Sequence, residues 1–166
     1  MAISYVVSDT PIGPLFLAST ERGIVRVAFE CEDFDSVIVE LEENLSDEAV
    51  EDSEVLAKAV KQFDEYFAGV RQEFELDLDH SLSSGFRRDV QEQLTNIDFG
   101  TTQSYQEVAA TVGNPKAVRA VGSACATNPI PVVVPCHRVL RSDGSLGGYR
   151  GGLKIKTTLL ELEQAA

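Results

Sequence analysis

The sequence predicts an α+β protein of two domains, a small N-terminal domain of β-meander and helices over residues 1–80 and a mainly helical domain over residues 81–166. Three observations predict this class. β-rich runs separated by turns dominate the first 30 residues, helical periodicity with recognisable caps dominates after residue 81, and the charge balance changes between the halves. A chain of 166 residues is long enough for two small domains.

Three runs at the N-terminus predict the β-meander. They cover Ile3–Val7, Pro14–Ala18 and Ile24–Phe29 and are rich in β-branched, aromatic or aliphatic residues. The turn signals Pro11-Ile12-Gly13 and Glu21-Arg22-Gly23 separate them. Successive strands joined by such short connections are expected to pair as neighbours in one sheet.

Two helices are expected to follow the meander. Residues Phe34–Leu45 have the pattern of an acidic amphipathic helix. A second helix is expected from about Ser53 to Gly69, where apolar residues recur at spacings of four, three and four. Between Phe74 and Leu78, apolar residues alternate with acidic ones, which fits either a solvated edge strand or an extended linker.

The second half predicts capped helices. A helix is expected over residues 85–96, where apolar residues repeat at every fourth position. Ser104 and Glu107 form a capping box for the next helix, which Gly113 ends. Asn114-Pro115 is expected to start another helix at once, because Asn caps well and Pro tolerates the first helical position. The pair forms a helix-turn-helix pattern over about residues 104–125, although many such pairs only pack a core.

The second helix of this pair, Lys116 to Ala124, combines small residues with one long cation, Arg119. A helix that reads the major groove is expected to carry several side chains that reach base edges. This composition instead favours close packing in a minor groove with Arg119 as a single probe. The alternative is that the small residues pack against another helix and Arg119 is a surface charge.

An apolar run clamped between prolines, Pro129 to Pro135, leads directly into Cys136, His137 and Arg138. Because proline cannot donate to a sheet ladder, the run predicts a strand that stops at Pro135 and exposes Cys136 at its end. The thiolate is the reactive form of cysteine, and neighbouring cationic or imidazole groups are expected to lower the thiol pKa. A Cys-His pair by itself is more often structural than catalytic, so the residues on either side of the pair must show which role it has.

A glycine-dense stretch follows, from Gly147 to Gly152, with Tyr149 and Arg150 inside it. It lacks the Lys-Ser/Thr ending of a P-loop, so a nucleoside triphosphate site is not expected. Glycines around a tyrosine better suit a loop whose backbone approaches a flat ligand. The last helix is expected over Leu153–Gln164.

The amino-acid composition indicates the class of protein and the cellular compartment. Hydrophobic content of 43% and charged content of 25% are typical of a soluble globular protein. We expect neither a signal peptide nor a membrane span, because the first 17 residues lack Lys and Arg and no apolar run reaches about 18 residues. Three cysteines without CxxC spacing predict a reducing, cytoplasmic location, and two histidines make a four-ligand zinc site improbable. We expect no metal site and no cofactor.

The net charge of −13 hides a strong asymmetry. Residues 1–80 hold 20 acidic and 5 basic side chains, a net charge of −15, whereas residues 81–166 hold 7 and 9, a net charge of +2. The second half can therefore present a basic face to nucleic acid while the first half faces water. The alternative is that the acidic half is only a solvated surface.

Taken together, these motifs resemble one family. Val132–Val139, with its Pro-Cys-His-Arg core, resembles the active-site segment of the 6-O-alkylguanine-DNA alkyltransferases, also called methylated-DNA–protein-cysteine methyltransferases. The resemblance extends over most of the chain. Its other motifs are Thr10–Leu15, Tyr105–Ala109, Gly113–Gly122, Asn128-Pro129, Gly148-Tyr149, Gly151–Leu153 and Leu159–Glu163.

The resemblance implies a ribonuclease-H-like N-terminal domain, a winged helix-turn-helix-like C-terminal domain and single-turnover transfer of an alkyl group from the 6-oxygen of guanine to Cys136. The implied partner is double-stranded DNA containing alkylated guanine, bound through its minor groove by a monomer. The lesion base is expected to leave the stack before it reacts.

The resemblance also assigns roles to matching residues. Cys136 accepts the alkyl group, His137 takes its proton through water, Glu163 orients His137, Asn128 braces the active-site turn, and Tyr105 donates to the departing guanine. Arg119 fills the hole left by the extruded base. The helix around it, namely Ala117, Val118, Ala120 and Gly122, contacts DNA, while Val139, Tyr149 and Arg150 line the base pocket with Tyr105.

Some positions depart from the family pattern. Gln91 stands where a tryptophan is common, Val118 where alanine is commoner, and Arg150 in a loop position that varies. Two other functions remain to be weighed: a DNA-lesion sensor without transfer activity, and a general thiol enzyme. Relatives of the first kind replace the cysteine, and the second would need neither the capped helix pair nor Arg119.

Overall fold

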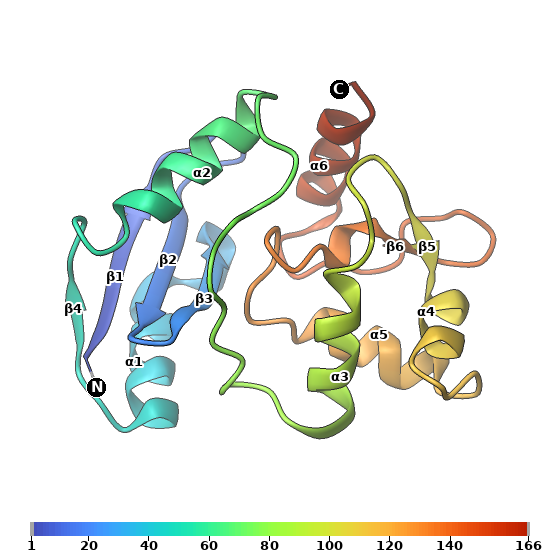
Figure 1. Cartoon of the computed structure of the whole chain (residues 1–166), viewed down its shortest axis with the longest axis horizontal. Coiled ribbons are helices and arrows are strands. Elements are labelled where there is room, and N and C mark those ends of the chain that lie inside the picture. Colours follow the sequence, from blue (N-terminus) through green and yellow to red (C-terminus); the bar gives the residue numbers. More distant parts are fainter. Residues whose placement is uncertain (1, 166) are drawn as a thin grey trace. The chain divides into compact units, whose positions relative to one another are not determined.

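The computed structural model describes residues 2–165, and the chain divides into two compact units between Leu82 and Ser83 (Figure 1). The first unit is a sheet with helices, and the second is mainly helical. The predicted α+β class is therefore confirmed. Each unit has its own core, and the two are described separately below.

The sheet of the first unit has four strands in the order β3-β2-β1-β4. The predicted meander forms β1 (Ile3–Ser8), β2 (Leu15–Thr20) and β3 (Gly23–Phe29), and its neighbours pair antiparallel. β4 (Ala49–Glu51) adds a short parallel edge beside β1 and was not expected from the sequence. At three residues, it is too short to show an alternating pattern.

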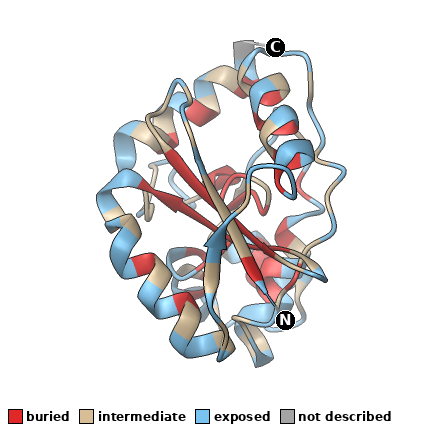
Figure 2. Ribbon diagram, turned by 90° about the vertical axis from the view of Figure 1, so that its left-hand side faces the viewer, coloured by how far each residue is buried: buried red, intermediate tan, exposed pale blue. Residues whose placement is uncertain are grey.

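Helices cover this sheet. α1 (Phe34–Leu45) follows a short 3-10 turn, η1 (Glu30–Glu32), and α2 (Ala57–Phe67) follows β4. β2 and β3 are buried along most of their length, β1 is mostly half-buried, and the helices keep exposed faces (Figure 2). One core cluster joins the strands to α1; its buried members are Ile3, Phe16, Ala18, Val25, Ala28, Val37 and Leu41.

One expectation for this unit is wrong, and one open alternative is decided. The second helix begins at Ala57, not near Ser53, because Asp52 Oδ1 accepts from the backbone amides of Glu54 and Val55 and holds a turn there. For residues 74–78 the sequence left an edge strand and an extended linker open, and the structure shows the extended linker, with one bridge from Leu78 to Ile24. The side chain of Gln62 occupies both backbone groups of Glu75, so these groups are not available to a ladder.

The second unit combines four helices with a small parallel ladder. The helices are α3 (Gly85–Leu94), α4 (Tyr105–Thr111), α5 (Val118–Ala126) and, at the end, α6 (Leu153–Ala165). The ladder pairs β5 (Gln103–Ser104) with β6 (Val139–Leu140). The 3-10 helix η2 (Cys136–Arg138) directly precedes β6.

In the helix pair α4–α5, α4 starts where the sequence predicted, but the connection between the two helices is longer than predicted. Ser104 caps α4 as expected, and its Oγ accepts from the Glu107 amide at 3.0 Å. α4 ends in a Schellman-type turn at Gly113, which has a φ of +86°. α5 begins at Val118 and not at Asn114-Pro115, because the Ala117 amide bonds the Asn114 carbonyl and closes a separate turn first.

Candidate active site

Cys136 follows a tight loop, and the predicted strand before it does not form. Pro131 and Val134 make one isolated bridge, and Val132 has a φ of +73°. The Asn128 side chain organises this loop: its oxygen accepts from the Ile130 amide at 3.0 Å and its nitrogen donates to the Val134 carbonyl at 2.9 Å. Prolines deprive the segment of ladder donors, so side-chain bonds replace the ladder.

The environment of Cys136 differs from the expectation in two respects. The residue is buried, with 3% of its surface exposed, and does not protrude from a strand end. Burial raises the pKa of its thiol, although a hydrogen bond from Asn128 and the charges of Lys156 and Arg150 oppose that rise. The expectation of a lowered thiol pKa is therefore wrong for the free protein. The thiol is protonated at neutral pH and needs a base before it can react.

His137 lies beside Cys136 in sequence but points to α6. Successive side chains on a 3-10 helix project about 120° apart, so neighbours on η2 face different partners. The His137 Nε2 lies 2.6 Å from Glu163 Oε2, and both side chains are buried. Arg138 donates to the same carboxylate through Nε at 2.7 Å and through Nη2 at 3.0 Å. Two donors from η2 thus converge on one carboxylate of α6.

This network selects the tautomer of His137. A carboxylate held by a bidentate arginine is ionised and accepts, so Nε2 carries the hydrogen and Nδ1 is left as a base. Nδ1 is buried and has no hydrogen-bond partner among the described residues. Burial lowers the pKa of His137 despite the opposing pull of Glu163, so the ring is neutral at pH 7 and able to take a proton.

A cavity of about 440 Å³ lies beside α5. It is lined by six residues predicted from the sequence: Tyr105, Val118, Arg119, Gly122, Tyr149 and Arg150. Gly147 and Gly148, from the glycine-dense loop expected to approach a flat ligand, also line it, and Ala126 and Arg141 line it without having been predicted. Ala117, Ala120 and Val139, also predicted to lie at the DNA face or pocket, are not among the lining residues. The cavity therefore brings together the helix pair and the glycine-dense loop.

Tyr105 and Gly147 meet in this cavity. Gly147 has a φ of +68°, and a Cβ at this position would lie 2.7 Å from the Tyr105 hydroxyl oxygen. Only glycine therefore allows the loop to lie against the ring in this position. Burial and the nearby Cys125 and Cys136 raise the pKa of Tyr105 to about 12, which keeps its hydroxyl protonated and able to donate.

Arg119 is exposed on α5, at the lining of the same cavity. Its neighbours on the helix are small or exposed: Val118 is 38% exposed, and nothing lies within 4 Å of a Cβ placed on Gly122. The alternative in which the small residues pack against another helix does not describe this face. It does describe the opposite face, where Val121, Ala124 and Cys125 are buried.

The sequence did not predict any role for Lys156, which is fully buried in α6. Its ammonium group donates to the carbonyls of Val139, Leu146 and Gly148. The one available signal was its helical spacing from Leu159 and Glu163, three and seven residues on, which puts all three on one face. A lysine on the buried face of a helix must have partners for its charge, but the sequence alone does not distinguish it from a surface lysine.

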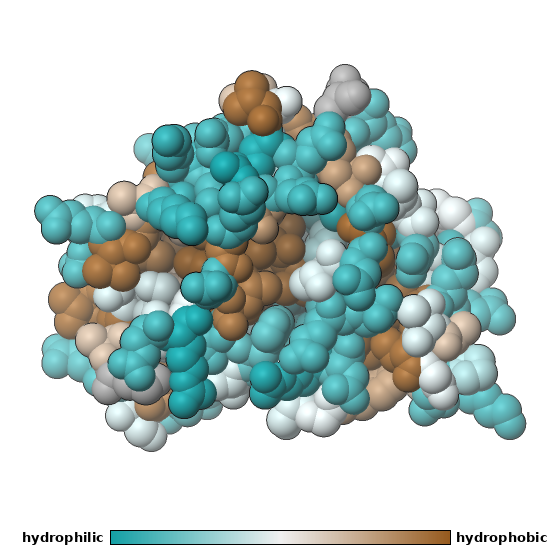
Figure 3. All heavy atoms as spheres, in the orientation of Figure 1, coloured by the Kyte–Doolittle hydropathy of each residue, from teal (hydrophilic) through white to brown (hydrophobic). Residues whose placement is uncertain are grey.

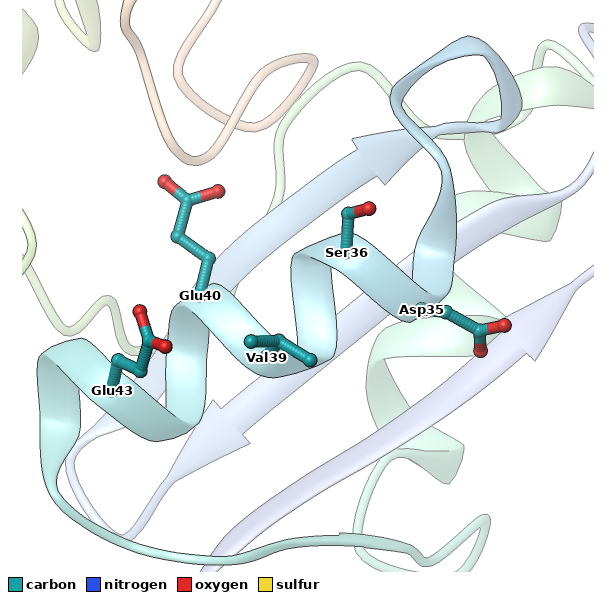
Figure 4. Close-up of a pocket in the computed structure, with 5 residues that line it drawn as sticks. All are labelled: Asp35, Ser36, Val39, Glu40 and Glu43. Carbon is teal, nitrogen blue, oxygen red and sulfur yellow. The ribbon is translucent and has the colours of Figure 1, made fainter.

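Other features of the described residues limit the kinds of site present. Within residues 2–165, no group of three or more His, Cys, Asp and Glu side chains could hold a metal ion. In the same range, no helix is long and apolar enough to cross a bilayer. A shallow hollow on α1 is lined by Asp35, Ser36, Val39, Glu40 and Glu43, whose side chains lie along the helix surface (Figure 4).

Comparison with protein families identifies the class. Residues 85–165 match the family described as 6-O-methylguanine DNA methyltransferase, DNA binding domain. Residues 3–80 match 6-O-methylguanine DNA methyltransferase, ribonuclease-like domain. Together the two matches cover nearly the whole chain, and the chain belongs to the 6-O-methylguanine DNA methyltransferase family.

Individual relatives agree with this assignment. The methylated-DNA–protein-cysteine methyltransferase of Methanosarcina acetivorans is 40% identical over 159 residues, 96% of this chain and 97% of the relative. That of Mycobacterium leprae is 43% identical over 157 residues, 94% and 89% of the two chains. A crystal structure of the Mycobacterium tuberculosis O6-methylguanine methyltransferase superposes with a TM-score of 0.86 at 36% identity, covering 98% and 93%. Mycobacterium tuberculosis OGT in complex with DNA gives 0.79 at 35% identity, covering 99% and 94%.

Proposed function

We propose that this protein repairs DNA by transferring an alkyl group, methyl in the simplest case, from the 6-oxygen of guanine to its own Cys136. The observation that carries the proposal is the buried array of Cys136, Asn128, His137 and Glu163, which Arg150, a lining residue of the 440 Å³ cavity, joins by donating to the Asn128 carbonyl. The names of the relatives, methylated-DNA–protein-cysteine methyltransferase, support the same reaction.

The first step removes the thiol proton. Neutral His137 takes it at Nδ1 through a water, and the resulting imidazolium is stabilised by the Glu163 carboxylate. Asn128 donates to the sulfur and favours the thiolate that forms. Because burial disfavours the charged thiolate, we infer that it forms only as it reacts.

In the second step, the thiolate attacks the alkyl carbon. A sulfur–carbon bond forms, the bond from carbon to the guanine 6-oxygen breaks, and its electron pair stays with the purine. The Tyr105 hydroxyl, protonated because its pKa is raised to about 12, donates to the ring as that charge develops. The thioether has no easy hydrolytic exit, so each molecule acts once.

Recognition of DNA is assigned to the second unit. α5 is presented to the minor groove, where its small exposed face permits close approach and Arg119 occupies the space of the extruded base. We assign residues 81–166 to DNA binding and chemistry and residues 1–80 to a separate supporting domain. The protein acts as a monomer, and its three free cysteines suit the reducing cytoplasm.

The test is transfer of a labelled methyl group from duplex DNA containing methylated guanine. Label is expected on protein at about one group per molecule, and peptide mass mapping is expected to find it on Cys136. Cys136→Ser should accept none, whereas Cys125→Ser, which changes the other buried cysteine, should retain transfer. Label on Cys125 with Cys136 unmodified, or sustained turnover with excess DNA, would refute this assignment.

A further inference from the structure

The cavity beside α5 is bordered by positive charge. Its lining residues, among those that the structure describes, include three arginines, Arg119, Arg141 and Arg150, and neither aspartate nor glutamate. The whole chain, by contrast, carries a net charge of −13. A cleft lined by one sign of charge attracts ligands of the opposite sign. Arg119 is assigned to the space of the extruded base and Arg150 donates to the Asn128 carbonyl, which leaves Arg141 without a role.

The position of Arg141 follows from the small parallel ladder. β5 and β6 pair with Ser104 opposite Leu140. The next residues along the chain are Tyr105 and Arg141, so these two leave the ladder side by side, and both line the cavity. The charge of Arg141 acts on the Tyr105 hydroxyl, where it opposes the rise in pKa. Arg141 therefore lies at the cavity wall beside the residue that is proposed to donate to the guanine.

A closed turn fixes the backbone of Arg141 and leaves its side chain available. The Arg141 amide donates to the Ser145 carbonyl, and the Arg141 carbonyl accepts from the Gly144 amide, each at 2.9 Å. The neighbouring acid, Asp143, is engaged within the turn, where its Oδ1 accepts from the amide and the hydroxyl of Ser145. Arg141 is exposed, and among the described residues its guanidinium group has no hydrogen-bond or ion-pair partner. It can therefore bind an anion without first breaking an intramolecular bond.

The anion that the proposed function brings to this wall is a phosphodiester. A base that leaves the stack stays joined to its sugar, so the phosphates on either side of that nucleotide come to the cavity with it. A guanidinium group matches two phosphate oxygens through two parallel N–H bonds. A free guanine base carries no phosphate and would gain nothing from Arg141.

We propose that Arg141 is a DNA-binding residue that holds a phosphate flanking the extruded nucleotide and so keeps the lesion base in the cavity. This role rests on the function proposed above. It differs from the role of Arg119, which occupies a space that exists only in a duplex. Single-stranded DNA has no such space to fill but carries the same phosphates. Arg141 is therefore expected to act on both forms of DNA, and Arg119 on the duplex alone.

The experiment measures second-order rates of single-turnover transfer from three substrates: duplex DNA, single-stranded DNA and the free base, each with alkylated guanine. Arg141→Gln should slow about tenfold on both kinds of DNA, the effect of one lost charge-assisted hydrogen bond, and keep the wild-type rate on the free base. Arg119→Ala should slow on the duplex alone. The control is Arg88→Gln, which should match wild type on all three; Arg88 is exposed on α3, pairs with Glu92 and does not line the cavity.

Binding gives a second readout that does not depend on transfer. In a Cys136→Ser background, the affinity for alkylated duplex DNA is measured against potassium chloride concentration. One phosphate contact contributes roughly 0.9 to the slope of log affinity against log salt, so Arg141→Gln should reduce that slope by about one. Arg141→Lys keeps the charge but loses the planar fork, so it should retain the wild-type slope with a smaller loss of affinity.

The outcomes separate this role from the proposed function. A wild-type protein that transfers no alkyl group would refute the proposed function, while the salt slopes would still test the phosphate contact. An Arg141→Gln protein, folded by its thermal unfolding, with the wild-type rate on single-stranded DNA or an unchanged salt slope would overturn the role of Arg141. Equal slowing on all three substrates would assign Arg141 to the chemistry beside Tyr105 and would overturn the phosphate contact as well.

Discussion

Glu163 has two tasks, to orient His137 and to neutralise Arg138. Its bonds and charge raise the pKa of His137 against the stronger lowering by burial. A histidine whose pKa is depressed in the folded state stays neutral below pH 6.5, the pKa of a free histidine. As pH falls below 6.5, the unfolded chain binds the proton more readily than the folded protein does, so the folded protein loses stability. The wild-type rate should therefore hold at pH 6.5 and decline only below it.

We predict that Glu163→Gln slows methyl transfer by about a hundredfold, because the imidazolium that forms loses its counter-ion. The acid limb of the rate profile should move to still lower pH, since the influence that raised the His137 pKa is gone. Stability should also fall by about 3–5 kcal/mol, because Arg138 is left buried without its partner. Rates across pH, corrected for the folded fraction, test this, with Glu161→Gln on the exposed side of α6 as the control. An acid limb that moves to higher pH would contradict the assigned roles.

Arg119 is predicted to act on DNA and not on chemistry. Arg119→Ala should slow repair of duplex DNA by about tenfold or more, because extrusion of a base costs a few kcal/mol and loses its support. Reaction with free alkylated guanine should hardly change, since Arg119 has no bond to Cys136, His137 or Glu163. Single-turnover rates on both substrates make the comparison. Equal slowing on duplex and free base would put Arg119 in catalysis or folding.

At the scale of the element, the start of α4 matters most, because Tyr105 follows its cap directly. Ser104 Oγ accepts from the Glu107 amide, and Glu107 Oε1 accepts from the Ser104 amide, each at 3.0 Å. Ser104→Ala removes the first bond and should lower the free energy of unfolding by about 1 kcal/mol. Chemical denaturation measures it.

The chain contains a matched control for this prediction. Ser84 stands at the N-cap of α3 but makes no side-chain capping bond there. Ser84→Ala should therefore change the free energy of unfolding by less than about 0.5 kcal/mol. Equal losses from both substitutions would mean that hydroxyl solvation or chain entropy, and not the capping bond, sets the stability of these helix starts.

At the scale of the whole molecule, the acidic N-terminal half sets the response to salt. The face seen in Figure 3 is largely hydrophilic, with apolar side chains gathered in separate places. Residues 1–80 carry a net charge of −15, and the α1 face with Glu40 and Glu43 contributes to it (Figure 4). Like charges held close in the folded state repel, and added salt screens them.

We predict that 1 M potassium chloride raises the midpoint of thermal unfolding by roughly 2–4 °C, equivalent to about 1 kcal/mol for a chain of this length. The increment should shrink in the double variant Glu40→Gln, Glu43→Gln, which removes two of the charges. DNA affinity should respond in the opposite direction and fall with salt, because binding releases counterions. A midpoint that falls with salt would show that attractive ion pairs outweigh this repulsion.

The features that the sequence alone determined are local ones. The β-meander, the capping box of α4, the Gly113 stop and the Pro-Cys-His-Arg motif depend on neighbours within a few residues, where turn chemistry and side-chain period act directly. The relation of Glu163 to His137 and of Asn128 to the turn came from family resemblance. The structure contains both contacts.

Tertiary structure decided the features that depend on distant segments. The apolar run before Cys136 has the composition of a strand, but Asn128 and the prolines make it a loop, and burial raises the thiol pKa that adjacent cations were expected to lower. From the sequence, Lys156 cannot be told from a surface lysine. In the structure it is buried, and the carbonyls of Val139, Leu146 and Gly148 accept from its ammonium group. Convergence of backbone groups depends on how a folded loop lies against a helix, and no local pattern of residue types records it.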